Sequence, residues 1–182
     1  MFVAAGLCCL LQSCGPAVTD LKFESVNAID PTNPANAADS RRSVPGQFLL
    51  DVHLSTRRDL AAIIKENPAF NIGADTSLCR GRAFDDVRRL QSDPYLFDAN
   101  VQISAFGDVR NAAPALPDGR FAYEVYVLIA WPATHGDFRY SLRDEPADTC
   151  LRLSGGAMLA GTISSNVVVV PASAIAAAFA PR

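Results

Sequence analysis

The chain has 182 residues and a formal net charge of −3, and apolar residues make up 49% of it. This length predicts one folded domain with enough chain to bury a real core. Nucleic-acid-binding domains usually present a basic face. Since this chain is mildly acidic and its arginines are scattered, we expect no nucleic-acid partner.

The first residues are predicted to be a targeting signal and not part of the folded domain. Residues 2–11 (FVAAGLCCLL) are all apolar or glycine, and no charge occurs before Asp20. A run of about ten apolar residues is shorter than the roughly 20 that a membrane-spanning helix needs, but it fits the apolar region of a secretory signal peptide. An ordinary secreted protein, and a cytoplasmic domain that buries this run as its first strand or helix, are the alternatives.

The apolar run ends in Leu11-Gln12-Ser13-Cys14. This sequence resembles the lipobox of bacterial lipoproteins, which has an aliphatic residue, a tolerant position, a small residue and then a cysteine. The resemblance implies that residues 1–13 are a signal peptide and that the Cys14 thiol receives a diacylglycerol. The mature chain, residues 14–182, would then be held in a membrane by a lipid anchor, which is effectively permanent at about 0.8 kcal/mol per buried CH₂. Because Gly15 and not Asp follows the cysteine, the resemblance further implies the outer membrane, with the protein facing the periplasm.

The remaining cysteines predict a disulfide. Cys8 and Cys9 lie in the expected signal and Cys14 is the expected lipid acceptor, which leaves Cys79 and Cys150 as a pair in an oxidising compartment. A Cys79–Cys150 bond would close a loop of about 70 residues and stabilise the fold by roughly 4 kcal/mol. Two buried free thiols, or a pair of metal ligands, are the alternatives.

Residues 14–182 are predicted to form one mainly β domain. Short alternating apolar segments and turn residues favour an antiparallel β-sandwich, immunoglobulin-like or similar, with seven to nine strands and two or three short helices. The most regular strand is 120–131, which we place in the centre of a sheet because both of its faces are largely apolar. Further strands are expected at 19–29, 47–54, 98–106, 137–143, 149–153 and 166–170, and one that ends near Leu78-Cys79.

The segments between these strands carry weaker signals. Residues 30–46 are rich in Pro, Asn, Ala and Ser and predict a long exposed loop. Short helices are expected at 57–66 and 172–180, and one or two helical turns at 84–90. Ser154-Gly155-Gly156 is expected to make a turn, whose backbone N–H groups could bind an anion or could simply close a hairpin.

The sequence contains no motif of a common catalytic or metal site, such as HExxH, CxxC, GxSxG or a Walker loop. His53 shares a strand face with Asp51, which could orient it as a general base or a metal ligand, although a solvent-facing strand has the same composition. His135 and Asp137 could contribute to a metal or ligand site, or could merely form a hairpin loop. We therefore predict no catalytic residue, no metal site and no cofactor.

A cluster of acidic residues is also predicted not to form a metal site. Four aspartates could bind Ca²⁺ if the fold gathered them, but their spacing is not that of an EF-hand. Four arginines lie beside them in the sequence, so a solvated surface of ion pairs is the simpler prediction. The aspartates are Asp85, Asp86, Asp93 and Asp98, and the arginines are Arg80, Arg82, Arg88 and Arg89.

One set of residues suggests recognition. Tyr and Arg are favoured at protein interfaces, and the candidate interaction surface consists of Tyr95, Phe97, Arg120, Glu124 and Tyr126. The expected function is a non-catalytic, lipid-anchored protein that binds or assembles with protein partners in the bacterial envelope. An immunity-type lipoprotein that neutralises a toxin is a variant of the same class. The alternatives are a periplasmic hydrolase or carbohydrate-active domain that uses His53 or His135 with a carboxylate, and a metal-binding envelope protein.

Overall fold

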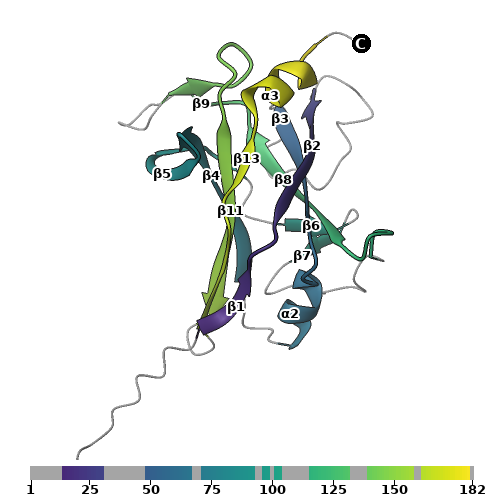
Figure 1. Cartoon of the computed structure of the whole chain (residues 1–182). Helices are drawn as coiled ribbons and strands as arrows, with labels where there is room; N and C mark the ends of the chain where they lie inside the picture. Colours follow the sequence, from purple (N-terminus) through teal and green to yellow (C-terminus); the bar gives the residue numbers. More distant parts are fainter. Residues whose placement is uncertain are drawn as a thin grey trace, which may run out of the picture.

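The computed structural model describes residues 14–30, 48–66, 71–92, 96–98, 101–103, 115–131, 139–157 and 161–180. In these ranges the protein is mainly β, with two short helices (Figure 1). The elements are β1 (Cys14–Val18), β2 (Lys22–Ile29), β3 (Leu49–Thr56), α2 (Leu60–Glu66), β4 (Asn71–Arg80), β5 (Ala83–Arg89), β6 (Leu96–Asp98), β7 (Val101–Ile103), β8 (Phe121–Leu128), β9 (Ala130–Trp131), β10 (Tyr140–Ser141), β11 (Thr149–Ala157), β12 (Gly161–Ser165), β13 (Val168–Val170) and α3 (Ala172–Ala178).

Two sheets contain most of these strands. Sheet A has the order β1-β12-β11-β4-β5, and β13 also pairs with β11; sheet B has the order β2-β3-β8-β6-β7. All pairings are antiparallel except that of β1 with β12. Strands β9 and β10 form a separate two-stranded sheet. The mainly β class predicted from the sequence is confirmed.

The main core lies between sheet A and sheet B, which pack on each other (Figure 1). Because side chains alternate along a strand, each sheet sends every second residue into this core. Sheet A contributes Ile72, Ala74, Leu151, Leu153 and Ile163, and sheet B contributes Leu50, Val52, Leu54, Tyr123, Val125 and Val127. Strand β8 lies between β3 and β6, so its predicted central position is confirmed.

Two local predictions are wrong. Residues 84–90 were expected to form helical turns, but residues 83–89 form β5, which returns along β4 after a turn with Gly81 at φ 67°. Ser154-Gly155-Gly156 was expected to form a turn, but it lies inside β11, between β4 and β12. A Cβ on Gly155 would collide with the carbonyl oxygen of Asn71. Close strand packing, and not a turn, therefore requires glycine there.

Other predicted elements are shorter or divided. The strand expected at 98–106 overlaps two strands, because Asp98 of β6 pairs with Val101 of β7. The helix expected at 57–66 begins at Leu60, and the one expected at 172–180 ends at Ala178. The expected signal peptide and nearly all of the loop expected at 30–46 lie outside the described residues. In the described part of the chain, no helix has the length and apolar character to span a membrane.

The two remaining cysteines form the predicted disulfide. Cys79 at the end of β4 is bonded to Cys150 of the neighbouring β11, and their Cα atoms are 5.0 Å apart. The backbone N–H of Cys79 also donates to the carbonyl oxygen of Asp148 over 2.9 Å. The bond therefore joins two adjacent strands of sheet A, and the alternatives of free thiols or metal ligands do not apply.

Candidate functional site

The face of sheet B that points away from the main core carries a row of polar residues. In the strand register, His53 of β3 lies opposite Ser25 of β2 on one side and Glu124 of β8 on the other. Glu124 in turn lies opposite Phe97 of β6. Three strands thus place Ser25, His53 and Glu124 in one row, which we call the His53 row.

A second row lies beside it. Asn27, Asp51 and Tyr126 are register partners on β2, β3 and β8, one alternation step from the His53 row. Since residues two apart on a strand point to the same side, both rows share the outer face of sheet B. Two of the residues in the predicted interaction surface, Glu124 and Tyr126, are therefore neighbours of the predicted His53–Asp51 pair.

Hydrogen bonds link the two rows. Nε2 of His53 lies 3.1 Å from Oδ2 of Asp51, and the Nδ2 atom of Asn27 lies 3.4 Å from the same nitrogen. The Tyr126 hydroxyl donates to Oε2 of Glu124 over 3.1 Å. A carboxylate can only accept, so Nε2 of His53 carries the proton and donates to Asp51, which fixes the orientation of the imidazole. In this tautomer Nε2 has no lone pair for the Asn27 amide, whose 3.4 Å approach is then a contact and not a hydrogen bond.

This polar cluster is half-open to solvent. The His53 side chain is 32% exposed and that of Asp51 is 15% exposed. Oδ1 of Asp51 is buried and has no hydrogen-bond partner among the described residues. A buried acceptor without a donor costs about 1–3 kcal/mol. In the described part of the chain, this oxygen therefore lowers stability.

An apolar cluster borders the polar rows. Ile29, Leu49, Tyr126 and Leu128 are buried together, apart from the main core. Tyr126 is only 1% exposed, and its hydroxyl reaches Glu124 while its ring belongs to the apolar cluster. The prediction that Tyr126 offers a surface to a partner therefore needs correction, since this side chain is buried although it lies on the same face as His53.

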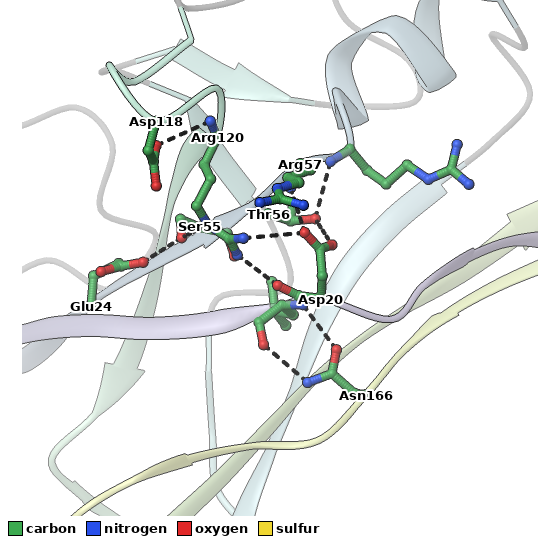
Figure 2. A network of polar contacts seen from close by, with 10 residues as sticks. Asp20, Glu24, Ser55, Thr56, Arg57, Asp118, Arg120 and Asn166 are labelled. Carbon is green, nitrogen blue, oxygen red and sulfur yellow. Dashed lines mark hydrogen bonds and ion pairs between the residues drawn. The ribbon is translucent and has the colours of Figure 1, made fainter.

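Arg120 needs the same correction, because it is 4% exposed and lies in a separate polar network (Figure 2). Its guanidinium donates to Oγ of Ser55 over 2.7 Å and to the carbonyl oxygens of Ser55 and Asp20 over 2.8 and 2.6 Å. It also forms an ion pair with the Asp20 carboxylate at 3.2 Å. The guanidinium is thus occupied within the fold.

Asp20 is the second centre of this network. It accepts from the Thr56 hydroxyl over 2.6 Å and from the backbone N–H of Arg57 over 2.9 Å. Burial opposes ionisation, but these hydrogen bonds and the charge of Arg120 together hold the pKa of Asp20 below its ordinary value. Asp20 lies between β1 of sheet A and β2 of sheet B, so the network fixes the point at which the chain crosses from one sheet to the other.

Two further contacts complete the crossing. The Ser55 hydroxyl donates to the carboxylate of Glu24 on β2. The Asn166 side chain accepts from the backbone N–H of Leu21 over 2.9 Å and donates to its carbonyl oxygen over 3.0 Å. Figure 2 shows these groups around Arg120 and Asp20. We call the set of Asp20, Glu24, Ser55, Thr56, Arg120 and Asn166 the Arg120 network.

The predicted acidic cluster divides between the two sheets. Asp85 and Asp86 lie on β5 of sheet A, whereas Asp98 lies on β6 of sheet B, and Asp93 is outside the described residues. Asp85 pairs with Arg88 at 2.8 Å and Asp86 with Arg89 at 2.8 Å. A hydrogen bond from Arg88 lowers the pKa of Asp85, and one from Arg89 lowers that of Asp86. This is the predicted surface of ion pairs.

The ion pairs extend over the outer face of sheet A. Arg152 on β11 contacts Asp75 and Asp86 at 3.3 Å, and its guanidinium lies 4.0 Å from the centre of the Phe84 ring. In the ranges that the structure describes, no group of three or more His, Cys, Asp or Glu residues could hold a metal ion. Tyr95, His135 and Asp137, which the sequence also singled out, lie outside those ranges.

No protein-family model, curated protein or solved structure matches this chain. The site therefore rests on its own geometry. The sequence had indicated His53 with Asp51 and, separately, Glu124 with Tyr126, and strand register unites them. It had not indicated Ser25 or Asn27. Ser25 and Asn27 alternate with Val26 along one strand, and this alternation is the only sequence signal for them. It does not indicate which strand pairs with theirs.

Proposed function

We propose that the mature chain is a lipid-anchored protein of the bacterial outer membrane, facing the periplasm, which binds a protein partner of an envelope assembly. Two features support the location. The sequence Leu11-Gln12-Ser13-Cys14 resembles a lipobox, and disulfides such as Cys79–Cys150 persist in oxidising compartments. The two packed sheets support an antiparallel β-sandwich, immunoglobulin-like or similar, as the rigid scaffold for binding.

The outer face of sheet B is the proposed binding surface, and its His53 row carries the proposal. His53 is partly exposed and held by Asp51, and Ser25 and Glu124 flank it across the neighbouring strands. A row of this kind offers donors and acceptors from a rigid backbone, which suits specific recognition of a polar protein surface. The buried Oδ1 of Asp51 supports a functional role, because proteins break the rule of satisfied polar groups mainly at functional sites.

Photo-crosslinking in intact cells tests the binding surface. A photoreactive residue at Ser25, which is exposed, should capture one discrete partner, and the same residue at the exposed Arg82, between β4 and β5 of sheet A, should not. Adding His53→Ala to the Ser25 variant should lower the yield of the adduct about tenfold, which corresponds to about 1.4 kcal/mol. Arg152→Ala is the matched control, because its side chain is 31% exposed on the other sheet. No adduct, or equal yields with His53→Ala and Arg152→Ala, would contradict the proposal.

The lipid anchor has an independent test. Intact mass and N-terminal analysis of the protein extracted from membranes without reductant should give a chain that begins at Cys14 and carries acyl mass. The same spectrum should lack two protons for the Cys79–Cys150 disulfide. A chain that still begins at Met1 with five free thiols would remove both the anchor and the envelope location.

A second function has one specific observation in its favour. Ser25 lies opposite His53 in the register, and His53 is hydrogen-bonded to Asp51, so the three residue types of a Ser-His-Asp hydrolase share one sheet face. In this alternative, His53 acts as the general base for a Ser25 nucleophile. A fluorophosphonate probe should then label the wild type and the His135→Ala variant but not Ser25→Ala or His53→Ala. Absence of labelling in the wild type rules this function out.

A further inference from the structure

We infer that sheet A stands directly on the bilayer, with the strand ends around Cys14 against the lipid headgroups and no tether between them. This inference rests on the proposed acylation of Cys14. It concerns which part of the fold meets the membrane, which the proposed function leaves open.

The first argument is the position of Cys14 in the sheet. Cys14 is the first residue of β1, and its backbone is paired with Thr162 of β12. Thr162 pairs with Gly156 of β11, and Gly156 with Asn71 of β4. These four residues form one row across the end of sheet A, about 14 Å wide at the usual strand spacing. An acyl group on Cys14 would therefore place the whole row at the membrane surface.

The second argument is that burial and hydrogen bonds fix the backbone that follows Cys14. Val18, four residues on, is fully buried in the main core, and its carbonyl oxygen accepts from the N–H of Asn166 over 3.0 Å. Leu21 is buried as well, and the Asn166 side chain holds both its N–H and its carbonyl oxygen. Asp20, which lies between Val18 and Leu21 in the sequence, is bound by the Arg120 guanidinium. The segment from Cys14 to β2 is thus fixed at several points and cannot act as a spacer.

The third argument concerns the opposite end. From Asn71 to Arg80, β4 rises roughly 30 Å, and the disulfide lies near this far end. Figure 1 shows the start of β1 and the helix α3 at opposite ends of the molecule. The turn at Gly81-Arg82, the disulfide and α3 would therefore point away from the bilayer. Because no spacer separates the domain from its lipid anchor, a protein partner must itself lie close to the same membrane.

The test measures the height of two labelled positions above the bilayer. The variants Thr162→Cys and Arg82→Cys replace exposed residues at the two ends, and each adds the only free thiol to a chain with acylated Cys14 and the intact disulfide. Each protein is labelled with a fluorophore and reconstituted into phosphatidylcholine vesicles that contain a headgroup nitroxide quencher. Quenching at position 162 should exceed that at position 82 about threefold or more, since the two heights differ by roughly 30 Å.

A linker variant provides the control. Twenty Gly/Ser residues inserted between Ala17 and Val18 would give an end-to-end distance of about 25 Å and should abolish the difference between the two labels. Equal quenching without the linker, in protein whose mass shows an acylated Cys14, would overturn this inference alone. Protein without acyl mass would instead overturn the proposed function on which it rests.

Discussion

The Arg120 network and the His53 row both include residues of β2 and β3, yet they differ in how far their central side chains are exposed to solvent. Arg120 is 4% exposed, and its donors reach Ser55 and both the backbone and the carboxylate of Asp20. The His53 side chain is 32% exposed, and its partner Asp51 keeps a buried oxygen without a donor among the described residues.

The difference separates polar groups that hold the fold from polar groups that we propose to serve recognition. A buried charge is tolerable only when it is paired and hydrogen-bonded, as Arg120 is. The buried Oδ1 of Asp51 has no donor among the described residues and costs stability, and we propose that partner binding maintains it. Substitutions in the Arg120 network should therefore lower stability and leave partner binding unchanged. Substitutions in the His53 row should lower partner binding and leave stability nearly unchanged.

The largest effect is expected from Arg120→Ala. It should lower the free energy of unfolding by about 3–5 kcal/mol, because it leaves the Asp20 and Ser55 acceptors without their donor. Urea unfolding followed by fluorescence measures this loss. Arg152→Ala is the control, since this partly exposed arginine should cost about 1 kcal/mol or less. Equal losses for the two variants would show that the Arg120 network does not hold the crossing between the sheets.

A smaller loss is expected from Asn166→Ala. The substitution removes two hydrogen bonds to the backbone of Leu21, and it should lower the free energy of unfolding by about 1–2 kcal/mol. Asn166→Asp should recover part of this loss, because its carboxylate can still accept from the N–H of Leu21. If Asn166→Ala unfolds at the wild-type urea concentration, the Asn166 contact is dispensable.

The charge of Asp20 should make stability depend on pH. Hydrogen bonds and Arg120 outweigh burial and lower its folded pKa, so its contribution is present above its unfolded pKa of about 3.9 and is lost as the pH falls through the lower folded value. Between about pH 5 and pH 2, the wild type should therefore lose more stability than Asp20→Asn. Glu145→Gln, at an exposed turn, should follow the wild type. Parallel curves for the wild type and Asp20→Asn would contradict the assignment.

The smallest change in stability is expected from His53→Ala. Because the imidazole is partly exposed and on the outer face, the free energy of unfolding should change by about 0.5 kcal/mol or less, while crosslinking to the partner falls. Arg120→Lys offers the reverse test, since a lysine cannot reproduce the fork of donors. It should lower stability without altering crosslinking in the protein that remains folded. A large loss of stability in His53→Ala would place the His53 row among the groups that hold the fold.

The mainly β class, the central position of β8 and the Cys79–Cys150 pairing could be predicted, because each depends on local alternation or on counting. The prediction for residues 84–90 failed because β5 pairs along β4 through the turn at Gly81, and strand pairing overrode the local pattern. The prediction of a turn at Gly155 failed for a similar reason. Glycine is required there because the backbone of Asn71 leaves no room for a Cβ, and not because the chain turns.

The sequence by itself determined the alternating apolar strands and the pair of cysteines left for a disulfide, since these follow from residue types and their spacing. Only the tertiary structure decided which strands became neighbours. Register placed Ser25 and Glu124 beside His53, and the crossing between the sheets buried Arg120 against Asp20, 100 positions away. Such contacts depend on how distant segments pair, and hydrophobic spacing within one segment carries no information about the partner strand.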